Sequence, residues 1–183
     1  SLKINGQAAP GTLISGVIPE TTDTWRVNQE IRQDGNQAVV KLSATGNQAY
    51  FPGNRQNLTD WQLELNPVIP IDLAIDLGAG EADLDLAKLQ VKNLKYDFGV
   101  GTLRLHLPEG SALTGEVDGG IGFLTIQVPS TVGVEIQAET GLVIRSLPTG
   151  YTKAGENLYR SPNFQTAATK VNLKINLALG QLI

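Results

Sequence analysis

The sequence predicts an all-β fold of stacked β-rungs, like a single-stranded β-helix solenoid, with a 21-residue period and capping strands at both ends. Three observations predict it. Glycines recur every 21 residues, alternating apolar residues flank them in matching columns, and no useful stretch has the period of a helix. A fixed period of this length is the signature of a repeat architecture whose units bury their apolar faces only by stacking.

The glycines come in regular pairs that mark a corner in each repeat. The first glycine of the pair recurs every 21 residues, at Gly78, Gly99, Gly120 and Gly141. The second members are Gly80, Gly101 and Gly122. The fourth copy has Val143 at the second place, so we expect the last rung to deviate. Glycine suits a corner because it accepts positive φ and lets neighbouring backbones approach closely. We therefore predict these glycines as structural turns.

Apolar residues alternate on both sides of each corner. In the first copy they are Ile71, Leu73, Ile75 and Leu77 before the corner and Ala82, Leu84 and Leu86 after it. Alternation with period two turns one face of a strand inward and the other towards solvent. Large residues meet small ones in successive copies, as in the column Tyr96, Val117, Ala138, which fills a narrow core without overpacking. Each copy therefore reads as two short strands joined by a glycine corner.

The flanks of the repeat are less regular and are interpreted as caps. We assign residues 1–65 to an N-terminal β capping segment and residues 66–183 to the β-rung repeat with a C-terminal capping strand, in one continuous domain. Strand-like runs lie at 12–18, 38–44 and 61–65, residues 148–165 read as a loop, and 171–179 alternate cleanly. Caps are needed because an open strand edge is a template for pairing with another chain.

Composition limits the classes of function. The 183 residues include no cysteine, which excludes disulfides, thiolate metal sites and cysteine nucleophiles. The net charge of −4 is mild and gives no electrostatic reason to expect nucleic acid as a partner. No apolar run approaches the ~20 residues that span a bilayer, so we expect no membrane insertion by this chain. We expect no cofactor.

Several stretches resemble the bacterial toast-rack family. They are residues 61–67 (WQLELNP), 71–86 (IDLAIDLGAGEADLDL), 120–129 (GIGFLTIQVP) and 159–164 (YRSPNF) with its alternating tail. The resemblance covers residues 61–183 well and the N-terminal part less sharply. These proteins are related to the C-terminal domain of the cell-wall-stress protein LiaF and to adhesin-like domains. The resemblance implies a β-rack, an extracytoplasmic location and an anchor in a segment not present here, and it supplies no catalytic motif.

The outward face near the first corner carries a weak candidate calcium cluster. Its members are Asp76, Glu81, Asp83 and Asp85. Later copies lose the acids, since Arg104 and His106 occupy the columns of Asp83 and Asp85. A calcium roll repeats its oxygen ligands from turn to turn. The pattern therefore favours a solvated strand face, with Asp83 near Arg104 and Asp85 near His106 as charge pairs across adjacent rungs. We predict no metal site as the main interpretation.

No catalytic residue is predicted either. His106 is the only histidine, and a catalytic triad would need a nucleophile and a carboxylate arranged around it. Gly-x-Gly can mark a phosphate cradle, but such cradles open a helix, whereas these triplets open a strand. The pattern favours a structural role for both features.

The leading functional hypothesis is a non-catalytic extracytoplasmic domain of a bacterial envelope protein, structural or sensory, whose partners are proteins or cell-wall components. One alternative is a surface adhesin or glycan-binding module that uses the aromatic residues Trp25, Tyr50, Phe51 and Trp61. Sealing the end of the core is the competing role for these rings. A weaker alternative is a polysaccharide-active enzyme on a β-helix scaffold, built on the group Asp83, Asp85, Arg104 and His106. The oligomeric state stays open, with an end-to-end dimer as one option.

Overall fold

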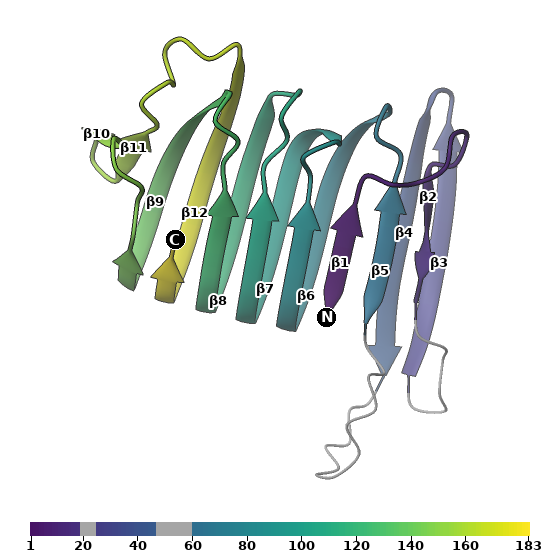
Figure 1. Cartoon of the computed structure of the whole chain (residues 1–183). Coiled ribbons are helices and arrows are strands. Elements are labelled where there is room, and N and C mark those ends of the chain that lie inside the picture. The colour runs from purple at the N-terminus through teal and green to yellow at the C-terminus, as the bar shows by residue number, and fades with distance from the viewer. Residues whose placement is uncertain (19–24, 47–59) are drawn as a thin grey trace.

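The protein is an open β-rack (Figure 1). The structure, a computed structural model, describes residues 1–18, 25–46 and 60–183, and within these ranges all regular secondary structure is β-strand. No helix in the described ranges is long and apolar enough to span a membrane. The prediction of an all-β repeat fold is confirmed.

Ten strands form one sheet in the order β10-β11-β9-β12-β8-β7-β6-β1-β5-β2, and β3 and β4 form a separate hairpin sheet. The first five strands are β1 (Leu2–Asn5), β2 (Ile14–Val17), β3 (Trp25–Asp34), β4 (Gln37–Gly46) and β5 (Trp61–Leu65). The long strands of the rack are β6 (Pro70–Asp85), β7 (Gln90–His106), β8 (Leu113–Gln127), β9 (Val132–Arg145) and β12 (Thr169–Leu182). Two short strands, β10 (Thr152–Gly155) and β11 (Leu158–Arg160), lie before β12.

Each long strand bends in the middle, so that it contributes two arms to the rack. Figure 1 shows β6, β7 and β8 running along the back of the molecule and returning along the front. We call the part before the glycine corner the first arm and the part after it the second arm. The alternating apolar residues of both arms meet between them in one continuous core. A single rung could not bury this apolar face, so the stack is the stable unit.

The register between neighbouring rungs confirms the 21-residue period. Ala79 pairs with Val100 and Val100 with Ile121, all in parallel. Stacking also explains the second glycine column. A Cβ added at Gly101 would lie 2.1 Å from the backbone oxygen of Gly80, and one added at Gly122 would lie 2.0 Å from that of Gly101. At Gly101 and Gly122 a side chain would therefore collide with the preceding rung.

The last strand lies inside the rack rather than at its end. β12 pairs in parallel with β8 on one side and with β9 on the other. Its residues fill the repeat columns, so Ile175 lies between Val117 and Ala138, and Gly180 lies beside Gly122. The expected C-terminal capping strand is thus an internal rung. The first arm of β12 is apolar at alternate positions and Leu182 is buried past the corner, and a place between two rungs covers this apolar face from both sides.

Both ends of the rack do carry capping strands. Beyond β9, the short strands β11 and β10 pair antiparallel, within the segment that was predicted to be a loop. At the other end, β1 pairs with the second arm of β6, followed by β5 and then β2. The expected strand runs 12–18, 38–44 and 61–65 coincide with β2, β4 and β5, whereas β1 and β3 were not predicted.

Large and small residues alternate through the core, as the columns predicted. Tyr96 is 1% exposed and faces Val117 of the next rung. Phe98 faces Gly119, where an added Cβ would lie 2.4 Å from the ring of Phe98. The narrow space between the arms is therefore filled by shape complementarity between adjacent rungs.

Candidate interaction surface

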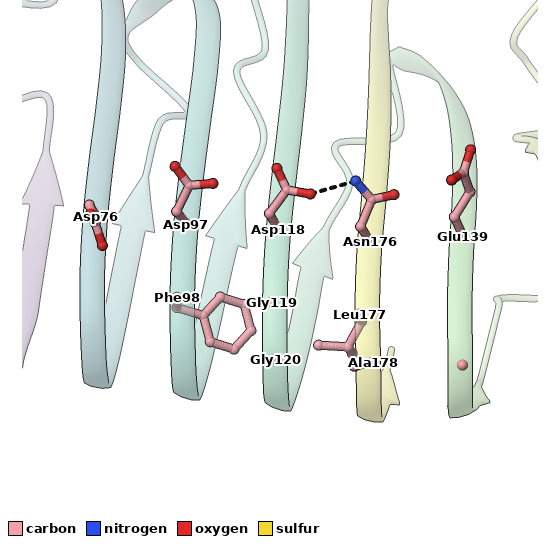
Figure 2. A pocket seen from close by; sticks show the side chains of 11 residues that line it. Asp76, Asp97, Phe98, Asp118, Gly119, Gly120, Glu139, Asn176, Leu177 and Ala178 are labelled. Carbon is pink, nitrogen blue, oxygen red and sulfur yellow. Dashed lines mark hydrogen bonds between the residues drawn. The ribbon is translucent and has the colours of Figure 1, made fainter.

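The outward face of the first arms carries a row of four carboxylates and one amide, which we call the acidic row. Its members are Asp76, Asp97, Asp118, Asn176 and Glu139. Direct pairing places them side by side on five adjacent strands: β6, β7, β8, β12 and β9. Parallel strands repeat at ~4.8 Å, so the five polar groups follow one another at that interval (Figure 2).

Two polar contacts involve members of the acidic row, one between two members and one with a neighbouring lysine. The amide nitrogen of Asn176 donates a hydrogen bond to a carboxylate oxygen of Asp118 (Figure 2). The ammonium of Lys95 lies 3.3 Å from a carboxylate oxygen of Asp97. The hydrogen bond and the charge of Asp97 raise the pKa of Lys95, so this lysine stays charged and offsets one of the carboxylates. The Oδ1 atom of Asn176 is shielded from solvent and has no hydrogen-bond partner among the described residues.

A neighbouring row on the same face has alternating charge. Lys95, Glu116 and Lys174 follow one another on β7, β8 and β12. Lys174 donates a hydrogen bond of 3.1 Å to Glu116, and this bond raises the pKa of the lysine. The outward face is thus a ladder of in-register polar groups whose charge changes from row to row.

The acidic row borders a broad, open hollow of about 650 Å³. Small residues at the corner, among them Gly120, Gly141 and Ala178, form its other side. These residues are small because added side chains would strike the next strand, as a Cβ at Gly120 would lie 2.4 Å from the oxygen of Gly99. The packing of the rack therefore produces a shallow groove with carboxylates along one wall.

The groove suits an elongated partner better than a small ligand. Its walls repeat along the rack, and carboxylates accept hydrogen bonds from ammonium, guanidinium or hydroxyl groups. In the described part of the chain, no three His, Cys, Asp or Glu side chains converge as a metal site would require. The chemistry present here is charge and hydrogen bonding at regular intervals.

Comparison with known proteins identifies the family. The family model described as "N-terminal domain of toast_rack, DUF2154" matches residues 1–127. The chain belongs to the toast-rack family. The match includes the N-terminal part, where the residues themselves resemble the family less sharply.

A solved structure has the same fold as this toast-rack chain. It is the crystal structure of a "putative cell adhesion protein" from Clostridium sporogenes ATCC 15579, with a TM-score of 0.85 and 24% sequence identity. The alignment covers 99% of this chain and 85% of the other. No curated protein matches the chain.

The four acids of the candidate calcium cluster lie on different arms of the toast-rack. Asp76 belongs to the first arm of β6 and to the acidic row, whereas Glu81, Asp83 and Asp85 lie on the second arm, past the corner. The structure brings Asp76 together with Asp97 of the next rung instead. The four acids are divided between the two arms of β6, so a calcium site built from all of them stays a prediction.

The residues expected to pair across adjacent rungs lie in register, and a side-chain contact joins one of the two pairs. Asp83 pairs in register with Arg104, and Asp85 pairs with His106. The Nδ1 atom of His106 lies 3.4 Å from a carboxylate oxygen of Asp85, and both side chains are partly exposed. This geometry is that of a cross-strand surface pair.

Of the four aromatic residues considered for glycan binding, the structure describes the side chain of Trp61 alone. Trp61 begins β5 and packs, partly buried, against the core, which agrees with a sealing role. Trp25 begins β3, but its side chain is outside the described part of the structure. Tyr50 and Phe51 also lie outside the described residues.

Sequence reasoning did not find the acidic row, although its signal is present. Asp76, Asp97, Asp118 and Glu139 are each separated by 21 residues, the same interval as the glycines. Grouping Asp76 with acids close to it in the chain misses the row, because stacked rungs gather residues one period apart. The fifth member, Asn176, has no such spacing because β12 is inserted.

Proposed function

We propose that this toast-rack chain is a non-catalytic domain of a bacterial envelope protein that works outside the cytoplasm through contacts with other proteins. The role is structural or sensory, and adhesion at the cell surface is one form of it. Family membership supports this proposal, as does a fold shared with a protein described as a "putative cell adhesion protein".

The observation that carries the proposal is the in-register polar face. A row of three aspartates, an asparagine and a glutamate crosses five rungs beside an open groove. Such a surface offers the same group at each step, which suits an extended or repetitive partner. Asp83, Asp85, Arg104 and His106, the group that an enzyme on this scaffold would use, pair with one another across rungs.

Location is tested by protease treatment of intact cells of the source bacterium. We expect the epitope-tagged full-length protein to be degraded while a cytoplasmic marker survives. Protection of the protein until the cells are lysed would overturn the extracytoplasmic part of the proposal.

Catalysis is tested on the purified chain with polysaccharide and ester substrates. We expect no turnover above that of the variant Asp83→Asn/Asp85→Asn, which has the same fold because both side chains face outward. Turnover that this variant loses would overturn the non-catalytic part of the proposal.

A further inference from the structure

The first arm of β6 has an edge that no described strand covers. β1 pairs only with the second arm of β6, from Leu2 beside Ala82 to Ile4 beside Leu84. The first arm, residues 70–77, pairs with β7 on one side only, and β4 pairs only with β3. β1 is thus half a rung, and the position behind it holds no described strand. We call this position the slot.

The side chains beside the slot are less buried than their partners one rung inside. In the first arm of β6 the inward residues Ile71, Leu73, Ile75 and Leu77 are only partly buried. Their partners in β7, which are Val91, Leu94, Tyr96 and Phe98, are 0%, 3%, 1% and 7% exposed. The core therefore opens at the slot, and a further strand there would close it.

The glycine columns continue to the slot. A Cβ added at Gly99 would lie 2.6 Å from the oxygen of Gly78, because the first glycine of each corner faces the preceding rung. Gly78 faces the slot in the same way, and a Cβ added there would meet no described atom within 4 Å. Gly78 also lacks the positive φ that would by itself favour glycine. A strand seated in the slot would give Gly78 the same reason to be glycine as Gly99.

β12 shows what a strand inserted beside an acidic rung looks like. It enters the stack in parallel, with aliphatic residues inward and Lys170, Asn172, Lys174 and Asn176 outward. Lys174 and Asn176 bond to the acids Glu116 and Asp118 of the adjacent strand. Next to the slot, the outward residues of β6 are the exposed aspartates Asp72 and Asp76. The two aspartates beside the slot therefore favour a strand that, like β12, has lysine and asparagine on its outward side.

We propose that the open edge of residues 70–77 is a strand-addition site for one extended segment of a partner protein. The segment runs parallel to β6, turns alternate aliphatic residues into the core and presents lysine or asparagine beside Asp72 and Asp76. Addition of a strand to an open sheet edge combines main-chain hydrogen bonds with pockets for alternate side chains. The inference rests on the proposed function, because it names where such a protein contact forms.

A single strand fits the slot better than a second copy of the rack. β1, β5 and β2 extend the front layer past β6. These strands would collide with a second rack stacked against β6, but they leave the position behind β1 open to one extended segment. An end-to-end dimer through β6 would need them to move aside.

The direct test uses a synthetic peptide with the sequence of residues 169–180 (TKVNLKINLALG) and an amidated end. In the register of β12 it places an asparagine beside Asp72 and another beside Asp76, with a lysine between them. We expect saturable binding to the purified chain by fluorescence anisotropy. Asp72→Lys/Asp76→Lys should weaken binding about tenfold, since the lysine of the peptide would then lie diagonally between two lysines of β6 instead of two aspartates. Glu109→Lys/Glu156→Lys changes the net charge equally, away from the slot, and should bind as the original chain does.

Gly78→Ala gives the sharpest control. Its Cβ meets open space in the chain alone, so the variant should fold normally and have the same melting temperature within error. With a strand in the slot, that Cβ would approach the backbone of the added strand as Ala178 of β12 approaches Gly120 of β8, so peptide binding should weaken without being lost. Gly110→Ala, which also adds a Cβ into open space, should keep full binding.

A tethered strand tests the geometry without a peptide. Because Leu2 pairs with Ala82, a second copy of residues 169–180 placed directly before Ser1 aligns its last glycine with Gly80. We expect this extended chain to melt at a higher temperature and to bind no peptide. The same extension with serine at its four inward positions should do neither.

Two results would overturn the proposal. One is peptide binding that Gly78→Ala and Asp72→Lys/Asp76→Lys leave intact, because the peptide would then be replacing β12 or binding elsewhere. The other is an absence of binding together with a tethered strand that leaves the melting temperature unchanged. Neither result bears on location or catalysis, so a failed slot and a failed proposed function can be told apart.

Discussion

The two ends of the rack are built from the same rung but are finished differently. At the β9 end, β12 is inserted between β8 and β9, and β11 and β10 extend the sheet. At the β6 end, β1 supplies a second arm and no described strand supplies a first arm. Equivalent residues therefore have a neighbour on both sides at one end and on one side at the other. The comparison shows that the contribution of a residue to stability depends on its column and on whether the adjacent rung is present.

The largest contrast is expected in the glycine columns. Gly101→Ala adds a Cβ 2.1 Å from the oxygen of Gly80, so the rungs must shift apart. We expect a loss of about 3 kcal/mol in the free energy of unfolding. Gly78→Ala adds a Cβ into open space and should change it by less than about 0.5 kcal/mol. Urea denaturation of the two variants measures the contrast, and equal losses would show that the two ends do not differ in packing.

A smaller contrast is expected for two core leucines in the same column. Leu173 is 2% exposed between β8 and β9, so Leu173→Ala should cost about 3–4 kcal/mol. Leu73 faces the slot and is only partly buried, so Leu73→Ala should cost about 1–2 kcal/mol. Thermal unfolding followed by circular dichroism gives both values. A cost at Leu73 as large as that at Leu173 would mean that the slot is covered.

Tyr96 sharpens the comparison through pH, because it lies one strand inside the open end, beside Ile75. Burial raises its pKa from 10.0 to about 12. Between these values the unfolded chain loses the phenolic proton and the folded chain keeps it, so stability falls as pH rises. The loss should reach about 2–3 kcal/mol by pH 12.

The measurement for Tyr96 is the difference in unfolding free energy between the original chain and Tyr96→Phe from pH 9 to 12. The subtraction removes the other groups that titrate in this range. A difference that stays constant across the range would mean that water reaches this part of the core.

The sequence predicted the features that recur in every rung and missed the strand that interrupts the repeat. The columns around Gly99 and Gly120 could be assigned because adjacent rungs lie one period apart and impose the same steric demand at each step. The place of β12 could not be found from the period, because Val117 and Ile175 are separated by 58 residues. A clue was present in the tail, where Leu177 and Gly180 have the spacing of Leu77 and Gly80.

The candidate surface was harder to predict than the fold. Asp76 was chosen, but it was grouped with acids that lie past the corner on the other arm. The inserted strand cannot be read from alternation alone, and it is needed to bring Asp118 and Asn176 together. Outward polar residues also carry a weaker signal, since solvent tolerates many side chains there.

The insertion of β12 has a consequence for how the chain is made. β12 follows β8 and β9 in the chain and is synthesised after them, yet it belongs between these two strands. Before β12 is present, equivalent residues of β8 and β9 lie 21 residues apart in the chain, which is the same offset that joins β7 to β8. The two strands can therefore pair with each other directly. That premature pairing must open to admit the tail. We expect folding to end in an exchange of strand partners, in which β8 and β9 leave each other and pair with β12.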